Sequence, residues 1–128
     1  MIKNKVYVSW DAVEWYVSFI VQRVNAENIS FSGVYGLPRG GLVFATMLSY
    51  RLNIPMLSAP ADNCLIVDDI CDSGESLCHY INNTSGTDRH NYTISTMYIN
   101  SACTLSQHIK YHYDIKSDDT WVVFPWEE

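Results

Sequence analysis

The segment Leu65–Leu77 constrains the fold of this chain more than any other part of it. An apolar strand, expected over Cys64–Val67, leads directly into two adjacent carboxylates, Asp68 and Asp69. A loop of small and polar residues follows, and it opens onto a helix that we expect to continue through Ile81. In open α/β sheets, ligands bind at the carboxyl ends of the strands, and a helix N-terminus there favours anions. The segment therefore predicts an α/β fold with a ligand site at the end of this strand.

Strands and helices alternate along the rest of the chain. Apolar residues at helical spacing cover Asp11–Val24, and a second helix, apolar on all sides and therefore buried, is expected over Leu42–Leu52. The remaining expected strands are Lys5–Ser9, Ser32–Leu37, Met56–Ala59 and Thr93–Ile99. This alternation predicts an α/β sandwich with a largely parallel sheet.

Composition and charge narrow the range of functions. The 128 residues, 48% of them hydrophobic, suit one domain over 1–128 with a core of its own. The net charge is −6 and no basic block is present, so we expect no nucleic acid partner. No apolar run approaches the roughly 20 residues of a membrane span, so no membrane partner is expected. The first residues do not resemble a secretory signal, and a cytoplasmic setting is expected.

The cysteines and histidines do not predict a disulfide framework or a zinc site. None of the four cysteines belongs to a C-x-x-C pair, and burial as small apolar residues is expected for Cys64, Cys71, Cys78 and Cys103. The spacing of Cys103, His108 and His112 resembles a metal motif. However, polar and apolar residues alternate over His108–Ile115, which predicts a strand. Residues four apart on a strand lie about 13 Å apart, too far to share one zinc ion.

The loop from Asp72 to Ser76 has the chemistry of a phosphate site. Its backbone N–H groups and the hydroxyls of Ser73 and Ser76 can surround a phosphate at the start of the helix. The side chains of Asp68 and Asp69 alternate in direction, and they can hold the vicinal hydroxyls of a sugar or a hydrated Mg²⁺. Together these groups favour a sugar phosphate as the ligand.

The segment Leu65–Leu77 resembles the phosphoribosyl pyrophosphate (PRPP) signature of type I phosphoribosyltransferases, a hydrophobic strand, Asp-Asp, and Asp-Thr/Ser-Gly-x-Thr/Ser. Other places resemble the bacterial xanthine–guanine (purine) branch of that family, in the expected order: Ser9-Trp10-Asp11, Pro38-Arg39-Gly40-Gly41-Leu42, Asp119-Thr120-Trp121 and Pro125-Trp126-Glu127. The resemblance covers nearly the whole chain. It implies a three-layer α/β sandwich with a mostly parallel central sheet.

The resemblance also implies a function. The expected reaction is a Mg²⁺-dependent glycosyl transfer in purine salvage, in which the phosphoribosyl group of PRPP passes to a purine base. The products are a nucleoside 5′-monophosphate and pyrophosphate. A 6-oxopurine such as guanine, xanthine or hypoxanthine is the expected base, and a homo-oligomer (dimer or tetramer) is the expected assembly.

Residue roles follow from the same resemblance. Asp68 and Asp69 would contact the ribose hydroxyls directly or through Mg²⁺, and Asp72 would exchange a proton at the purine N7; these three are the expected catalytic residues. PRPP would be bound by Arg39, Gly40, Asp68, Asp69, Asp72, Ser73, Gly74, Glu75 and Ser76. The base would be bound by Asp72, Asn100, Trp126 and Glu127, with the Trp126 ring stacked on it and the Glu127 backbone at its 2-position. In the loop of Arg39 and Gly40 the family often has a non-proline cis peptide bond.

The chain departs from the family pattern in three places. The connection Pro60–Asn63 stands where the family has a long flexible lid, and at under roughly 8 Å it is too short to cover the site. Asn100 replaces the family lysine that binds the 6-oxo group, and an amide can bind either an oxo or an amino group. Glu75 places an anion inside the phosphate loop.

Two further expectations follow from this pattern. Arg39 is the one basic side chain that the sequence places near the acids, so Mg²⁺ is needed to neutralise the substrate. The shortened lid leaves open a second function, a PRPP- or nucleotide-binding regulatory domain with little or no catalysis.

Overall fold

The computed structural model of the protein describes residues 2–75, 77–78 and 91–127. Its elements, in chain order, are β1 (Asn4–Tyr7), α1 (Trp10–Ala26), β2 (Val34–Gly36), α2 (Gly40–Leu52), β3 (Leu65–Cys71), β4 (Thr93–Asn100), η1 (Ser106–His108), β5 (Ile109–Tyr111), β6 (Asp114–Lys116), β7 (Thr120–Val123) and η2 (Pro125–Glu127). The helix that the sequence predicts through Ile81 extends outside these ranges. None of the helices within them has the length and apolar character needed to cross a bilayer.

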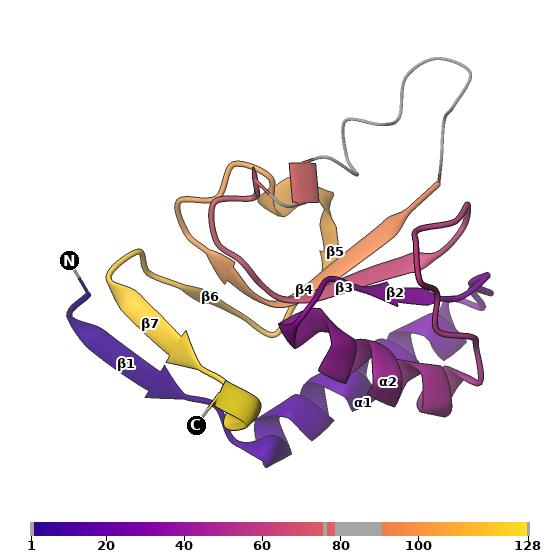
Figure 1. Ribbon diagram of the computed structural model, residues 1–128, viewed down its shortest axis with the longest axis horizontal. Helices are drawn as coiled ribbons and strands as arrows, with labels where there is room; N and C mark the ends of the chain where they lie inside the picture. Colours follow the sequence, from indigo (N-terminus) through magenta and orange to yellow (C-terminus); the bar gives the residue numbers. More distant parts are fainter. Residues whose placement is uncertain (1, 76, 79–90, 128) are drawn as a thin grey trace.

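Five strands form one parallel sheet in the order β2-β3-β4-β5, with β6 also pairing with β4 (Figure 1). Strand β4 pairs first with β5, at Ile94 and Ser95, and then with β6, over Tyr98–Asn100. A separate parallel pair, β1 and β7, carries the C-terminal turn η2 at its end. The predicted α/β class and mostly parallel sheet are confirmed, and the carboxyl ends of β3, β4 and β6 meet at one edge.

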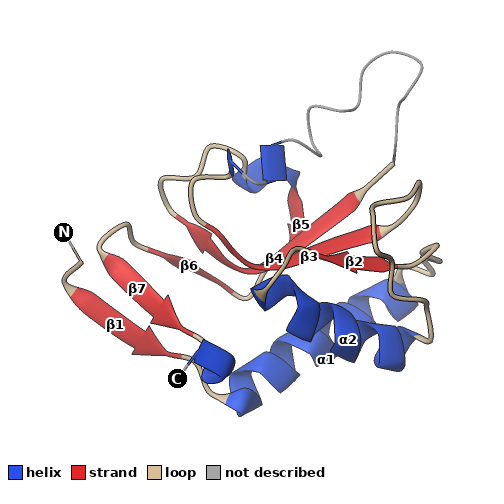
Figure 2. Cartoon of the chain, in the orientation of Figure 1, coloured by secondary structure: helices blue, strands red, loops and turns tan. Residues whose placement is uncertain are grey.

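Helices α1 and α2 pack together against one face of the sheet (Figure 2). The hydroxyl of Ser9 caps α1 by accepting a hydrogen bond of 3.1 Å from the backbone N–H of Ala12. Tyr16 of α1 is fully buried, with its ring edge-on to Phe44 of α2 and its hydroxyl hydrogen-bonded to Ser95 of β4. The apolar face predicted for α1 thus packs in the main core against the buried residues of α2. The prediction that α2 is buried on all sides was wrong, because Leu42 and Tyr50 are exposed.

Strand β3 is buried on both faces, which explains its continuous apolar sequence. Leu65 and Val67 point into the core beneath the helices, whereas Ile66 belongs to a second apolar cluster on the opposite face. That second cluster also contains Cys71 and Cys103, whose sulfur atoms lie 2.9 Å apart as free thiols. Over Leu65–Val67, successive side chains thus pack into two different cores.

Three sequence predictions about strands were wrong in their limits. The strand predicted over Cys64–Val67 continues to Cys71, so the two aspartates lie within β3 rather than after it. Met56–Ala59 contributes a single bridge, from Met56 to Val34. His108–Ile115 is not one strand, because β4 changes partner from β5 to β6 and the chain between them turns at Tyr113, whose N–H donates to Met97. The distance of about 13 Å expected between His108 and His112 therefore does not follow from strand geometry, because the two residues do not lie on one strand.

The short connection before β3 is held away from the acidic residues. The side-chain amide of Asn63 donates to the carbonyl oxygen of Ser30 at 2.8 Å, and Asp62 accepts from the backbone N–H of Asn91 at 2.8 Å. These contacts hold Pro60–Asn63 at the amino end of β3, opposite the end that carries the aspartates.

Candidate functional site

Asp68 and Asp69 form a half-buried acidic pair near the carboxyl end of β3. The carboxylate of Asp68 accepts a 2.8 Å hydrogen bond from the backbone N–H of Asp69, and the two carboxyl groups interact with each other. Burial, together with the neighbouring charge of Asp69, raises the pKa of Asp68 to about 8. Burial also raises the pKa of Asp69. A bound cation would offset both the burial and the mutual repulsion, so the pair suits a divalent metal.

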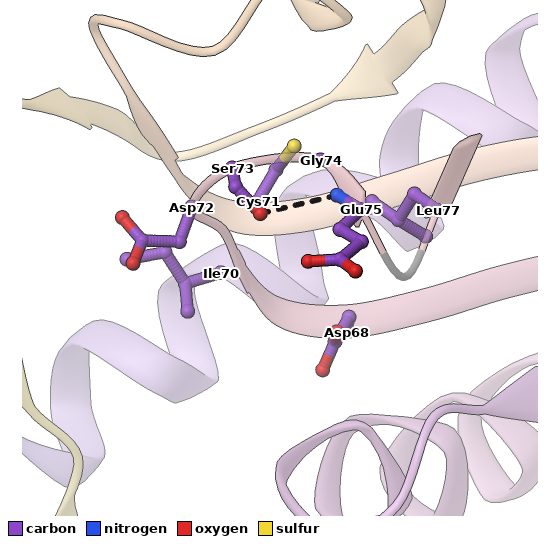
Figure 3. A pocket seen from close by; sticks show the side chains of 8 residues that line it. All are labelled: Asp68, Ile70, Cys71, Asp72, Ser73, Gly74, Glu75 and Leu77. Carbon is purple, nitrogen blue, oxygen red and sulfur yellow. Dashed lines mark hydrogen bonds between the residues drawn. The ribbon is translucent and has the colours of Figure 1, made fainter.

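The loop after β3 closes around a small pocket of about 90 Å³ (Figure 3). Gly74 adopts a φ of 84°, in the left-handed region that favours glycine, and its carbonyl oxygen accepts from the N–H of Cys78 at 2.8 Å. The Ser73 hydroxyl accepts from the N–H of Glu75 at 3.2 Å. The pocket lining is Asp68, Ile70, Cys71, Asp72, Ser73, Gly74, Glu75 and Leu77. Ser76 lies outside the described residues.

Glu75 is exposed and lines this pocket together with Asp68 (Figure 3). Two carboxylates therefore border a pocket whose backbone shape suits a phosphate. A cation beside them would offset the charge of Glu75, and that of Asp68 when it ionises, and so favour the entry of an anion.

The start of α2 is packed tightly onto β3 by glycines. A Cβ added to Gly40 would lie 2.0 Å from a carboxylate oxygen of Asp69, and one added to Gly41 would lie 2.5 Å from the carbonyl oxygen of Val67. The non-proline cis peptide bond expected in this loop is present between Pro38 and Arg39. Arg39 is exposed and its guanidinium forms no ion pair with the described part of the chain.

Asn100, at the end of β4, holds two carboxylates with one amide. Its Nδ2 donates to Oδ1 of Asp72 at 2.6 Å and to Oδ1 of Asp118 at 3.0 Å, while its Oδ1 accepts from the N–H of Ala102 at 2.9 Å. Asn100 is 4% exposed. All of its polar groups are therefore engaged, and it joins the loop after β3 to the segment after β6.

Lys116, the last residue of β6, provides a cation at the same place. Its ammonium lies 3.4 Å from Oδ1 of Asp72 and donates to the carbonyl oxygen of Thr120 at 2.9 Å. The hydrogen bond from Asn100, and then the charge of Lys116, lower the pKa of Asp72. Asp72 is therefore a carboxylate at neutral pH, unlike Asp68.

A second cavity, of about 320 Å³, opens beside Asp72. It is lined by Asp72, Ser73, Asn100, Ala102, Thr104 and Asp118. Its volume is at the lower end of the range for small-molecule sites. Asp72 and Ser73 line both cavities, so the two cavities adjoin at the loop after β3.

The C-terminal turn η2 approaches the other side of the acidic pair. Trp126 is half-buried, with its ring stacked on Phe124 at 5.1 Å and edge-on to Phe44 at 5.2 Å. The charge of Glu127 adds to burial in raising the pKa of Asp69. Asp69 thus lies close to Gly40 and Glu127, and none of these three residues lines the two cavities beside Asp72.

Lys116 and Asp118 are not among the site residues predicted from the sequence. Its expectation that Arg39 is the one basic residue near the acids was wrong, because Lys116 reaches Asp72 from β6. The cause is the parallel register, in which Asn100 is paired directly with Lys116. No local pattern reveals that register. The polar residues that follow Lys116, Ser117-Asp118-Asp119, were the one feature of the sequence that could have indicated a site there.

No protein-family model matches the chain, and no curated protein matches its sequence. Solved structures do match. The chain is similar to a purine phosphoribosyltransferase from Pyrococcus horikoshii OT3, with a TM-score of 0.78 and 23% identity over 98% of this chain and 95% of that one. It is also similar to a xanthine-guanine-hypoxanthine phosphoribosyltransferase from Helicobacter pylori, with a TM-score of 0.72 and 17% identity over 97% and 94% of the two chains.

A third similar structure is a hypothetical protein from Neisseria gonorrhoeae with bound ppGpp. Its TM-score is 0.76 and its identity is 15%, over all of this chain and 92% of that one. Each of these likenesses extends over nearly the whole length of both proteins. The chain therefore has the α/β fold of the purine phosphoribosyltransferases.

Proposed function

We propose that the protein is a Mg²⁺-dependent purine phosphoribosyltransferase, a single-domain enzyme of purine salvage in the cytoplasm. It would transfer the phosphoribosyl group of PRPP to a purine base and release pyrophosphate. The observation that carries the proposal is the grouping of Asp68, Asp72 and the loop Ser73–Glu75 around one pocket at the end of β3. Likeness of fold to purine phosphoribosyltransferases supports it.

In this proposal the loop after β3 binds the 5′-phosphate and the acidic pair binds the ribose. Backbone N–H groups of Ser73, Gly74 and Glu75, together with Ser76, would surround the phosphate. Asp68 and Asp69 would hold the ribose hydroxyls or Mg²⁺. Bound Mg²⁺ would neutralise the departing pyrophosphate. Mg²⁺ sites commonly use one or two carboxylates plus substrate phosphates, which fits this pair.

Asp72 is the proposed proton acceptor at the purine N7. Its lowered pKa keeps the carboxylate ionised at neutral pH. Nearby carboxylates would also stabilise the positive charge that develops on the ribose in the transition state. Asp68, which is mostly protonated at neutral pH in the absence of a cation, and the ionised Asp72 thus suit different tasks.

The remaining roles surround this centre. Arg39 and Gly40 would bind the pyrophosphate at the start of α2. The base would lie against Trp126, with the backbone of Glu127 at its 2-position and Asn100 near its 6-position. The purine and PRPP are the proposed partners, and a homo-oligomer is the proposed assembly.

A base-panel assay tests the function. Purified protein is incubated with PRPP and each purine or pyrimidine base, with and without Mg²⁺, and nucleoside monophosphate is measured. Asp72→Asn should lower the rate by about 10²–10⁴-fold, the usual contribution of a general acid or base. The control Glu14→Gln alters an exposed carboxylate paired with Arg51 and should retain the wild-type rate. Formation of nucleotide by Asp72→Asn at the wild-type rate would contradict the proposal.

A regulatory nucleotide-binding domain is the second candidate. Two observations favour it: the similar Neisseria protein holds ppGpp, and the connection Pro60–Asn63 is fixed at the far end of β3. Binding of PRPP with Mg²⁺, with no base in the panel converted, would support this candidate over the enzyme.

A further inference from the structure

Lys116 is a buried lysine in an acidic site. Its side chain is 8% exposed, whereas the side chain of its partner Asp72 is 62% exposed. An ammonium has three N–H donors and no acceptor. Its contacts within the described residues, to Asp72 and to the carbonyl oxygen of Thr120, engage two of these donors. One N–H therefore remains for a ligand beside Asp72.

Asn100, by contrast, has no N–H group left to donate to a ligand. Both N–H groups of its amide are donated, to Asp72 and Asp118, and its oxygen accepts from Ala102. Donating to the 6-oxo group of a base would require it to break one of these hydrogen bonds, which is costly. Asn100 is therefore a positioning residue that holds two carboxylates in place.

Asp118 presents the opposite chemistry to Lys116. It is exposed, lines the 320 Å³ cavity, and as a carboxylate it only accepts hydrogen bonds. Asn100 ties it to Asp72, and Asp72 in turn pairs with Lys116. One network of contacts thus joins an acceptor-only group that lines the cavity, Asp118, to a donor-only group, Lys116, which contacts Asp72 in the cavity wall.

The ligand edge that complements this pair is a ring N–H next to a ring carbonyl. A 6-oxopurine has such an edge, with an N1–H donor and an O6 acceptor. A 6-aminopurine has the opposite pattern, an acceptor at N1 and an amino donor at C6. Its N1 would then face the acceptor Asp118, and its amino group would face the donor Lys116. Unpaired groups of this sort are the strongest source of substrate discrimination.

We propose that Lys116 and Asp118 are the specificity-determining residues of the base site: the Lys116 ammonium donates to O6 and the Asp118 carboxylate accepts from N1–H, so that oxopurines bind and aminopurines are rejected. The proposal rests on the proposed function for the use of the cavity as a base site. It assigns the selection of the base to β6 and the segment after it, rather than to β4.

Binding of two nucleotides tests the pair independently of catalysis. IMP and AMP differ only at N1 and C6 of the base, and calorimetry gives a dissociation constant for each. Wild-type protein should bind IMP at least about 10-fold more tightly than AMP. Lys116→Met nearly keeps the length of the side chain but removes its charge. It should weaken the binding of IMP by about 10- to 100-fold and leave the binding of AMP nearly unchanged. The control Lys110→Met removes an exposed lysine of β5 paired with Glu27 and should change neither.

A second variant tests the proposal even if Lys116→Met does not fold. In Asp118→Asn the amide can donate to N1 of AMP, so the preference for IMP should fall mainly through tighter AMP binding. Three outcomes would overturn the proposal. The wild type could bind IMP and AMP equally, it could bind neither nucleotide, or the preference for IMP could survive in both variants. If the variants lose the preference for IMP and the wild type converts no base in the base-panel assay, the roles of Lys116 and Asp118 are upheld and the enzymatic function is rejected.

Discussion

Asn100 and Lys116 are directly paired across β4 and β6, and their side chains converge on the same oxygen, Oδ1 of Asp72. The amide nitrogen lies 2.6 Å from that oxygen and the ammonium lies 3.4 Å from it. The neutral and the charged contact both favour the ionised form of Asp72. Their roles can nevertheless be separated, because only Lys116 has a donor left for a ligand.

The first prediction concerns the pH dependence that Asn100 imposes on Asp72. The hydrogen bond from Asn100 is the main cause of the lowered pKa of Asp72, so Asn100→Ala should raise that pKa towards its usual value. A carboxylate with a lowered pKa keeps its charge to lower pH. The acid limb of kcat/KM should therefore shift to higher pH in the variant.

Asn100→Ala should also lower kcat/KM by about 10-fold or more for every base, because a hydrogen bond to a charged group contributes about 1.5–3 kcal/mol. The pH–rate profile for two different bases measures both effects. Gln107→Ala, which removes an exposed amide, is the control. An unmoved acid limb would show that Asn100 does not set the ionisation of Asp72.

The second prediction concerns stability and Asp68. Because the pKa of Asp68 is about 8 in the folded protein and about 3.8 in the unfolded chain, the folded protein binds a proton more tightly. The stability contributed by that proton is complete below about pH 3.8 and is lost as the pH rises through about 8. Asp68→Asn carries no charge to bury, so it should stabilise the protein at pH 8.5.

The expected gain at pH 8.5 is at least about 1.4 kcal/mol, the value of one pKa unit. Denaturant unfolding of the wild type and Asp68→Asn at pH 5 and pH 8.5 measures it, and the two proteins should differ much less at pH 5. Asp114→Asn, an exposed aspartate of β6, should show no such pH-dependent gain. Equal stability differences at both pH values would mean that Asp68 is ionised throughout.

The third prediction concerns the buried thiols. Burial and the neighbouring Cys103 thiol raise the pKa of Cys71 to about 12, so its reactive thiolate is scarce at pH 8. Alkylation of the native protein with iodoacetamide, followed by peptide mass spectrometry, should therefore label the partly exposed Cys78 well before Cys71 or Cys103. Faster labelling of Cys71 would show that this part of β3 opens readily.

Much of the fold follows from local sequence patterns. The apolar run of β3, the amphipathic spacing of α1 and the apolar α2 each determine their own element, and their alternation determines a parallel sheet. The region His108–Ile115 could not be predicted in the same way. Its alternation is real, but β4 pairs with β5 and then with β6, and the chain must turn between them at Tyr113. That change depends on a partner strand and not on the segment itself.

The site residues also fall into a group that a local pattern predicts and a group that depends on strand pairing. Asp68, Asp72 and Gly74 lie close together in the sequence, so a local motif was sufficient to select them. Lys116 and Asp118 reach Asp72 only through the pairing of β6 with β4. A sequence pattern does not encode which residue of a distant strand faces Asn100, and for that reason the expectation that Arg39 is the one cation near the acids was wrong.

The fourth prediction contrasts two neighbouring glycines at the start of α2. Gly40→Ala would place a Cβ 2.0 Å from an oxygen of Asp69, a side chain that can rotate away. The variant should therefore lose less than about 1 kcal/mol of stability, yet its PRPP binding should weaken because Asp69 is displaced. Gly41→Ala would place a Cβ 2.5 Å from the backbone oxygen of Val67, which cannot rotate, and should cost about 1–3 kcal/mol.

Thermal unfolding measures the stability of each variant, and titration with PRPP and Mg²⁺ measures binding. The double variant Gly40→Ala/Asp69→Ala isolates the contact, because the added methyl group no longer meets a carboxylate. If displacement of Asp69 is the whole effect, Gly40→Ala should change neither stability nor PRPP affinity in the Asp69→Ala background. An equal loss of PRPP affinity in both backgrounds would instead mean that the Gly40 backbone itself approaches the ligand, and Asp69 would have no part in the defect.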